Sequence, residues 1–287
     1  MTNKSICVKQ LRIKDNIQMA FIVLSTLISV GVLIGIIAYV AIRGFGSISW
    51  EFLTSVTSEM DNRFGILGNI VNTLYIIIIT LIIATPVGIG AAVYLTEYAK
   101  RGKLVKLIEF TTETLQGIPS IIYGLFGMVF FGVTIGLGTS IFCGCLTLTI
   151  MVLPLIIRTT QEALKTVPEG YRTGALGIGA TKWYMIRTII IPSALPGIVT
   201  AVILSIGRIV GESAALLFTA GSGYYLPRQL FSHVLKSGGS LTIQMYLSME
   251  RGEFDNAFGI ALVLVVIVLI INFATKLITG KMEKGTK

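Results

Sequence analysis

The chain has 287 residues, of which 54% are hydrophobic and only 13% are charged, and its formal net charge at pH 7 is +9. Soluble domains carry about 25% charged residues, so this composition excludes an ordinary soluble protein and indicates one that crosses a membrane several times. The positive charge is spread between the apolar runs, so membrane topology explains it better than nucleic-acid binding does.

Six apolar runs are long enough to span a bilayer core of about 30 Å. They lie near residues 17–42, 69–95, 107–132, 138–157, 193–217 and 257–279. The first run follows a basic segment and is not followed by a small-residue cleavage site, so we expect a retained span rather than a removed signal. The sequence therefore predicts an all-α polytopic membrane bundle of six transmembrane helices.

The distribution of basic residues predicts the orientation of this bundle. The N-terminus, the loop near 96–106, the loop 158–192 and the C-terminal end hold 17 basic residues, whereas the opposite side holds five. By the positive-inside rule, both termini and the loop 158–192 are cytoplasmic in a multi-pass protein of the cell membrane. The 17 are Lys4, Lys9, Arg12, Lys14, Lys100, Arg101, Lys103, Lys106, Arg158, Lys165, Arg172, Lys182, Arg187, Lys276, Lys281, Lys284 and Lys287; the five are Arg43, Arg63, Arg228, Lys236 and Arg251.

These features divide the chain into three parts. Residues 1–64 comprise the cytoplasmic N-terminus, the first span and an outer loop; 65–279 form the main transmembrane domain; and 280–287 form a cytoplasmic tail. Gly31 and Gly35 in the first span have the spacing of a helix-packing face. The three cysteines, Cys7, Cys143 and Cys145, are an odd number without the spacing of a disulfide framework, so they are interpreted as reduced apolar fillers. A metal-binding pair of Cys143 and Cys145 is disfavoured, because further ligands are lacking nearby.

The third span contains Gln116, Gly117, Pro119 and Ser120 inside an apolar run, which predicts a broken or kinked helix. Irregular backbone at membrane depth is tolerated only against protein or a water-filled cavity. The segment either lines a pathway or is a plain kink packed against a neighbouring helix, and the sequence leaves both readings open.

The fifth span carries Arg208 and, four residues later, Glu212. A rise of about 1.5 Å per residue places Arg208 in the outer half of the bilayer core, where a charge costs about 2.5–3.5 kcal/mol. Glu212 can reach Arg208 on one helix face. The pair is either structural and self-neutralising, or it holds a cation ready for an anion, with Gly207 and Gly211 leaving room beside it.

The loop 158–192 is predicted to form a helix, a turn and a second helix. Pro168 suits the first helical position, Gly179 a left-handed stop, and Thr181 the cap of a second short helix that ends before Pro192. One apolar stripe is predicted along the first helix at Leu164, Val167, Tyr171, Ala175 and Ile178. This hairpin lies on the membrane surface, packs on the bundle, or docks a soluble partner.

The outward segment 218–256 is a candidate surface for an external partner, and its His233 is read as a solvated loop residue. The sixth span is nearly pure Val, Ile and Leu and reads as a lipid-facing support helix.

Within the loop 158–192, Thr173-Gly174-Ala175, Gly179 and Pro192 resemble the EAA signature of ABC-importer permeases. In that family this loop forms coupling helices that fit a cleft in a cytoplasmic ATPase. Thr173 stands where the family has Glu. The resemblance implies ATPase coupling through Pro168, Tyr171, Thr173, Gly174, Ala175, Gly179 and Trp183.

Four longer segments, 86–98, 117–127, 153–159 and 207–221, resemble the permeases of the phosphate-specific ABC importer, in the A-type of its two paired permeases. The resemblance implies a type I importer fold and a heterodimer with the C-type permease. It also implies two cytoplasmic ATPase subunits and an external phosphate-binding protein. Family pathway arginines correspond to Arg208 and, as a second position, Arg158; Glu212 joins them as the expected partner of Arg208.

Other functions remain open from the residues alone. A permease for sulfate or molybdate would share the hairpin and an arginine, and an ATP-independent anion carrier would have the same composition. The chain contains no P-loop, so ATP hydrolysis is expected in partner subunits, and no cofactor is expected in this chain. An intramembrane enzyme is disfavoured, because the single histidine falls in an outer segment.

Overall fold

The computed structural model describes residues 13–58, 63–100, 102–226 and 230–285. Among the positions used above, Lys4, Cys7, Lys9, Arg12, Arg101, Arg228 and Lys287 lie outside these ranges.

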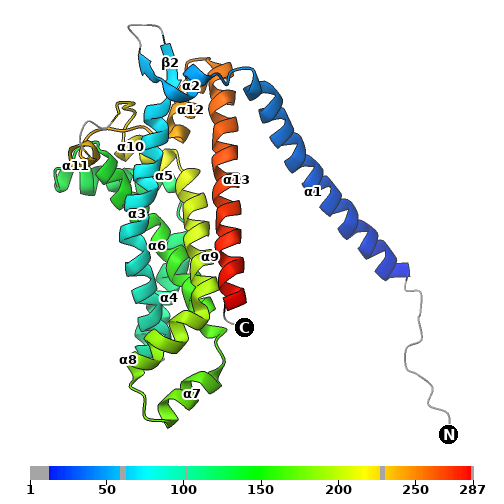
Figure 1. Ribbon diagram of the computed structural model, residues 1–287, viewed down its shortest axis with the longest axis vertical. Helices are drawn as coiled ribbons and strands as arrows, with labels where there is room; N and C mark the ends of the chain where they lie inside the picture. Colours follow the sequence, from blue (N-terminus) through cyan, green and yellow to red (C-terminus); the bar gives the residue numbers. More distant parts are fainter. Residues whose placement is uncertain (1–12, 59–62, 101, 227–229, 286–287) are drawn as a thin grey trace.

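The described chain is a bundle of long helices joined by shorter helical segments (Figure 1). The long helices and their π-helical extensions are α1 (Ile13–Phe45), α3 (Leu67–Val93) with η1 (Tyr94–Tyr98), α6 (Ile141–Lys165), η3 (Ile186–Ile190) with α9 (Ile191–Val210), and α13 (Phe254–Gly285). The shorter elements are α2 (Trp50–Thr54), β1 (Val56–Ser58), β2 (Arg63–Ile66), α4 (Lys103–Gln116), α5 (Ser120–Gly127), η2 (Met128–Thr134), α7 (Glu169–Gly177), α8 (Lys182–Met185), α10 (Ala214–Thr219), α11 (Leu230–Val234) and α12 (Leu241–Glu250).

The predicted six-span helical architecture is confirmed. Five helices of the described chain are long and apolar enough to cross a membrane, and a sixth span is possible if α4 and the α5–η2 segment, which meet at 102°, count as one broken span. One difference is the two-stranded antiparallel hairpin β1–β2, which the all-α prediction did not include. It lies in the connection between α1 and α3.

The fifth span begins and ends earlier in the chain than the predicted 193–217. The helix runs from Lys182 to Val210, so the expected stop before Pro192 is wrong. The π-helical turn η3 directly precedes Pro192, and the helix continues through the proline as α9. The outer end of the predicted span is a separate short helix, α10.

Two buried apolar clusters hold the bundle together. The larger cluster joins α3, α6, α9, α10, α12 and α13. Within it α3 and α6 approach closely, because a Cβ added at Gly88 would lie 2.6 Å from Cγ2 of Ile156. Cys143 and Cys145 are buried free thiols of α6, consistent with apolar filling. The smaller cluster joins the C-terminal ends of α3 and α6 and the N-terminal end of α9 to the hairpin. It comprises Ala92, Val93, Ala163, Leu164, Val167, Ala175, Met185, Ile186, Ile190, Ala194 and Ile198.

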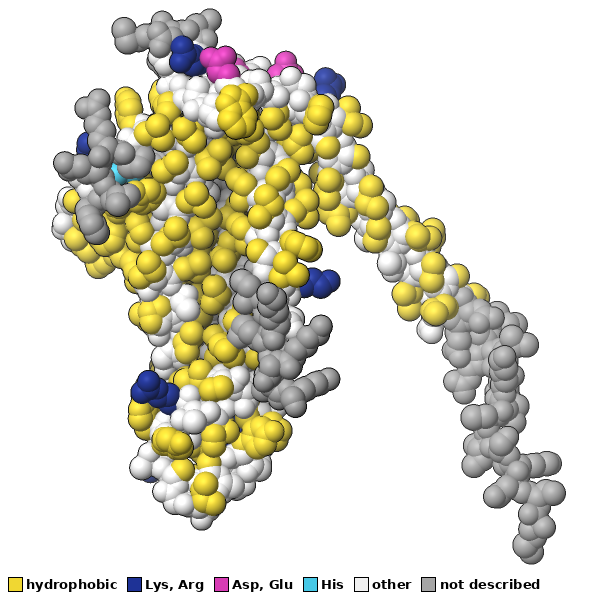
Figure 2. Space-filling model, viewed as in Figure 1, with side chains coloured by type: hydrophobic (Ala, Val, Ile, Leu, Met, Phe, Trp, Pro, Cys, Tyr) yellow, Lys and Arg dark blue, Asp and Glu magenta, His cyan; other side chains and the backbone are white. Residues whose placement is uncertain are grey.

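Helix α1 leaves the bundle and is exposed along most of its length (Figures 1 and 2). An added Cβ would meet nothing within 4 Å at Gly31 or Gly35, so the predicted packing face has no neighbour among the residues that the structure describes. The close approach occurs instead at Gly44, where an added Cβ would collide with the carbonyl of Phe258 in α13. Tyr39 packs edge-on against the Phe258 ring, with centroids 5.6 Å apart.

The interpretation of His233 as a solvated loop residue is wrong. The side chain is 4% exposed, and its Nε2 lies 2.7 Å from Oδ1 of Asn72 in α3. The Asn72 amide nitrogen donates to the carbonyls of Gly223 and Gly239, so Oδ1 is the acceptor and Nε2–H the donor. Tyr75 packs against the imidazole with ring centroids 5.6 Å apart. The contact fixes α11 to α3.

Acidification is expected to loosen this attachment. Burial, assisted by the charge of Lys236, lowers the pKa of His233 below its ordinary value of 6.5. The stability that the neutral imidazole contributes is present above the unfolded-state pKa and is lost as the pH falls through the lower folded-state pKa. Hydrogen exchange of α11, corrected for intrinsic rates, should accelerate below about pH 6.5. The His233→Gln variant should lack this pH dependence, and equal pH profiles for the two proteins would contradict the assignment.

Candidate functional site

The break between α4 and α5 is confirmed at Gly117–Pro119, between the two helices. Side chains satisfy carbonyls around it: the Gln116 amide donates to the carbonyl of Pro154 at 3.2 Å, and the Tyr123 hydroxyl donates to that of Leu115 at 2.8 Å. Gly124 then allows α5 to cross α10, since an added Cβ would lie 2.8 Å from Cα of Ala215. The irregular backbone is therefore stabilised by contacts with α6 and α10.

Arg208 lies in the last turn of α9. Its neighbours Leu204, Gly207 and Gly211 are exposed, so this face of α9 is open in the single chain. Among the described residues, no carboxylate lies within ion-pair distance of its guanidinium. Tyr123 of α5 lies within electrostatic range of this guanidinium. Arg208 is a partly exposed, uncompensated cation within an apolar span.

The predicted ion pair between Arg208 and Glu212 is wrong. Helix α9 ends at Val210 with Gly211 as its C-cap, so Glu212 does not lie one turn further on the same face. The Glu212 side chain instead accepts a hydrogen bond of 2.9 Å from the N–H of Ala215, and its residue is 8% exposed. The Thr242 hydroxyl donates to the Glu212 backbone carbonyl at 2.7 Å. Glu212 therefore stabilises the start of α10 rather than orienting Arg208.

Arg158 lies within α6 rather than at the start of a loop, because α6 continues to Lys165. Its guanidinium is 3.4 Å from a carboxylate oxygen of Glu113 in α4 and 3.4 Å from one of Glu162. Its side chain is 39% exposed, and two carboxylates already share its charge. Arg158 is thus a compensated cation, unlike Arg208.

Both arginines border the same broken segment. Arg158 contacts Glu113 near the end of α4, and Arg208 acts on Tyr123 in α5, just beyond the break. A guanidinium offers a planar fork of donors that matches the edge of an oxyanion. The arrangement suits two successive binding positions for an anion along α4 and α5. No group of three or more His, Cys, Asp or Glu side chains suited to a metal ion occurs among the residues the structure describes.

The hairpin after α6 has the predicted turn. Gly179 has φ of +88°, the left-handed region that favours glycine. The N–H of Ala180 donates to the carbonyl of Ala175 at 3.1 Å, and that of Gly179 to Leu176 at 3.0 Å, which is the Schellman pattern. Thr181 caps α8 by accepting a 3.3 Å bond from the N–H of Tyr184, as predicted. Pro168 differs by one position, since it is the N-cap of α7 rather than its first helical residue.

The predicted apolar stripe of this hairpin is only partly correct. Ala175 is 5% exposed and is the one buried residue of α7, whereas Tyr171 is 53% and Ile178 87% exposed. Because α7 contacts the bundle through a narrow face, Tyr171 and Ile178 point away from it. Other hairpin residues that present outward are Pro168, Thr173, Gly174, Leu176, Gly179, Trp183 and Tyr184. This exposed apolar surface is suited to a protein partner.

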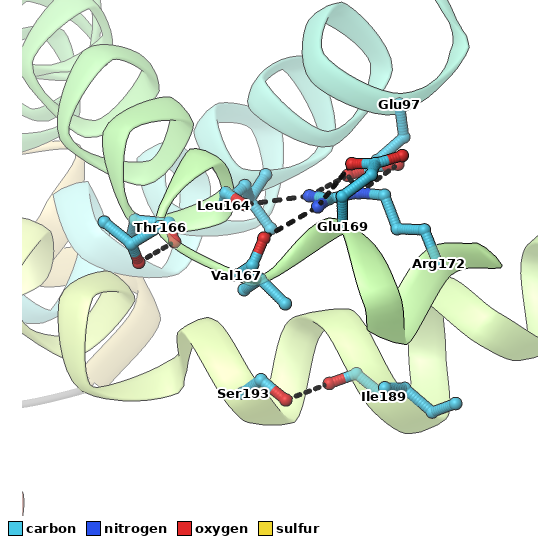
Figure 3. A network of polar contacts seen from close by, with 9 residues as sticks. Glu97, Leu164, Thr166, Val167, Glu169, Arg172, Ile189 and Ser193 are labelled. Atoms are coloured by element: carbon cyan, nitrogen blue, oxygen red, sulfur yellow. Dashed lines mark hydrogen bonds and ion pairs between the residues drawn. The ribbon is translucent and has the colours of Figure 1, made fainter. Parts of the chain in front are cut away.

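Sequence reasoning missed a buried ion pair that attaches the hairpin to the bundle (Figure 3). Arg172 of α7 donates to both oxygens of Glu97 in η1, with a shortest contact of 2.9 Å. The side chains of Arg172 and Glu97 are 13% and 5% exposed. Hydrogen bonding to Glu97 raises the pKa of Arg172, so the cation is retained despite burial. The only sequence signal was Glu97, an acidic residue at the C-terminal end of an apolar span, with no indicated partner.

Comparisons with known proteins agree with this geometry. The family model for the inner membrane component of binding-protein-dependent transport systems matches residues 84–287. A probable ABC transporter permease protein, YqgI of Bacillus subtilis (strain 168), is 33% identical over 92% of this chain and 95% of its own length. The phosphate transport system permease protein PstA of Mycobacterium leprae (strain TN) is 32% identical over 91% and 87%.

Solved structures support the same fold. A bacterial alginate ABC transporter, solved with an alginate-bound periplasmic protein, aligns with a TM-score of 0.67 at 19% identity over 93% of this chain and 96% of the other. The inward-facing MetNI methionine transporter aligns with a TM-score of 0.58 at 22% identity over 76% and 94%. The chain therefore belongs to the family of inner membrane components of binding-protein-dependent transport systems.

Proposed function

We propose that this chain is the A-type permease subunit of an ATP-driven phosphate importer and forms half of the translocation pathway. The observation that carries the proposal is Arg208, an uncompensated guanidinium beside the broken α4–α5 segment on a face of α9 that is open in the single chain. A cation inside a membrane span is costly and therefore marks a candidate functional site, here one suited to an anion. The open face of α9 leaves room for a second subunit to complete the pathway.

The hairpin supports an ATP-driven mechanism. Tyr171, Ile178 and Trp183 form an exposed apolar surface around a turn whose conformation requires Gly179. Such a surface fits a cleft in one of two cytoplasmic ATPase subunits, the other being left for the second permease. The basic residues around it favour a cytoplasmic location for the hairpin and both termini. Thr173 carries a hydroxyl where the family has a carboxylate, so docking here depends on shape and apolar contact.

Phosphate is the substrate favoured by the relatives and by the chemistry of the pathway. Several relatives named as phosphate permeases are 31–36% identical over more than four fifths of this chain. A guanidinium can bind two phosphate oxygens through charge-assisted bonds. A loaded external binding protein delivers the anion, the C-type permease supplies the other half of the pathway, and closure of the ATPases drives alternating access.

Co-purification tests the assembly. An affinity tag on this chain is expected to recover a second permease and two copies of an ATPase from membranes. Recovery of this chain without an ATPase, together with uptake that survives ATP depletion, would favour an ATP-independent carrier. Uptake of labelled phosphate should resist a 100-fold excess of sulfate or molybdate; strong competition by either would favour a permease for that oxyanion.

A further inference from the structure

The side chain of Arg172 connects three parts of the inner end of the molecule. Besides Glu97 at the end of α3, it donates to the carbonyl of Leu164 at 2.9 Å and to that of Val167 at 2.8 Å. Leu164 lies in the last turn of α6, whose final carbonyls have no partner within the helix. One guanidinium therefore connects the C-terminal end of α6, the end of the span that contains α3, and the docking helix α7 (Figure 3).

Few other side chains attach α7 to the bundle. Ala175 is its one buried residue, and a methyl group supplies little contact area. The connections before and after α7, at Val167–Pro168 and Gly179–Thr181, are short and bring the chain back to the bundle. The second carboxylate partner of Arg172, Glu169, is 76% exposed and contributes a surface contact that water screens. The orientation of α7 therefore depends mainly on the pair between Arg172 and Glu97.

The location of Glu97 connects α7 directly to the membrane span formed by α3 and η1. The residue lies in η1, which continues α3 without a break, so α3 and η1 form one span from Leu67 to Tyr98. The side of α3 above it packs closely on α6 at Gly88 and Ile156. Because the pair is buried and has several hydrogen bonds, it resists the small displacements that an exposed ion pair would absorb.

We propose that the Arg172–Glu97 pair is a positioning link that makes the docking helix α7 and the inner end of α3 move as one body, so that movement of the ATPase subunits reaches the membrane spans. The inference rests on the proposed ATP-driven function and assigns to these two residues the transmission step, not substrate contact. Loss of the link uncouples the two activities: ATP hydrolysis continues while transport falls.

The test measures phosphate transported per ATP hydrolysed by the purified full complex in proteoliposomes, with the external binding protein present. Arg172→Gln removes the cation but leaves Glu97 buried and unpaired. The double variant Arg172→Gln with Glu97→Gln removes both charges and should assemble normally, because replacing both members of a buried pair is often tolerated. Arg172→Lys keeps the charge but places its donors on one nitrogen, whereas the carboxylate and the two carbonyls are bound by three separate nitrogens of Arg172. Glu169→Gln is the matched control, since it alters the same network at its exposed edge.

We expect the ratio of phosphate to ATP to fall at least fivefold in the double Gln variant, less in Arg172→Lys, and not at all in Glu169→Gln. A double variant that assembles and keeps the wild-type ratio would overturn the link. So would reduced yield of both Gln variants together with an unchanged ratio in Arg172→Lys, because the pair would then serve folding alone. A wild-type complex without ATP-driven uptake would overturn the proposed function and the link with it, whereas normal wild-type uptake with unchanged ratios removes only the link.

Discussion

Replacing Arg208 with Gln is expected to lower phosphate uptake by at least about 100-fold while leaving the yield of the assembled complex unchanged. Hydrogen bonds to a charged group contribute about 1.5–3 kcal/mol each, so losing two of them accounts for a decrease of this size. Assembly should survive because, among the described residues, no carboxylate is left unpaired when this guanidinium is removed. The measurement is uptake of labelled phosphate by membranes that contain equal amounts of complex.

Two Lys variants separate charge from geometry. Arg208→Lys keeps the positive charge but loses the planar fork, so uptake should lie between those of the wild type and the Gln variant. Arg158→Lys should have a smaller effect, because Glu113 and Glu162 already share the Arg158 charge. Wild-type uptake by Arg208→Gln would remove this residue from the pathway, and full uptake by Arg158→Lys would identify Arg158 as a positive-inside anchor.

The features that the sequence predicted well depend on residues close together in the chain. The apolar runs, the break around Gly117 and Pro119, and the turn at Gly179 each follow from local composition or from the backbone preferences of glycine and proline. Thr181 was recognisable as a cap for the same reason, since its side chain bonds to an N–H only three residues away. Local physics is sufficient for such elements.

The features that the sequence could not predict depend on contacts between distant segments. The partners Arg172 and Glu97 are 75 residues apart, and His233 and Asn72 are 161 residues apart. Neither pair produces a periodic pattern or a fixed spacing in the sequence, because the packing of α3 against later helices determines which side chains come into contact. The basic residue Arg172 was informative only about membrane orientation until its neighbours were known.

The error at Glu212 has another origin. A spacing of four residues brings side chains together only if the helix continues through both of them. Gly207 and Gly211 were read as room for a ligand, but Gly211 is also the C-cap that ends α9. The same glycine therefore separates Glu212 from Arg208 and leaves the cation free, which strengthens the candidate pathway while removing the predicted pair.

The second large effect is expected at the turn of the docking hairpin, where Gly179→Val should abolish most of the substrate-stimulated ATPase activity. Gly179 has φ of +88°, and a β-branched residue there costs roughly 1–3 kcal/mol of backbone strain. An added Cβ would meet nothing within 4 Å, so a steric clash with the rest of this chain cannot account for a loss. Relief of the strain breaks the two Schellman hydrogen bonds and displaces Ile178 and Trp183 from the surface offered to the ATPase. The spans themselves should insert and pack normally.

Gly179→Asn provides the matched control, because Asn adds a side chain of similar size but tolerates the left-handed conformation far better than Val does. We expect stimulated ATPase activity to fall about tenfold in the Val variant and to remain near that of the wild type in the Asn variant, with equal amounts of both proteins in the membrane. A factor of ten corresponds to about 1.4 kcal/mol, which lies within the range of the strain. Equal losses in the two variants would show that any side chain at this position obstructs docking, so the conformation of the turn would not be the cause. Normal stimulation in the Val variant would mean that the ATPase does not bind this hairpin. The coupling surface would then lie elsewhere on the cytoplasmic side of the protein.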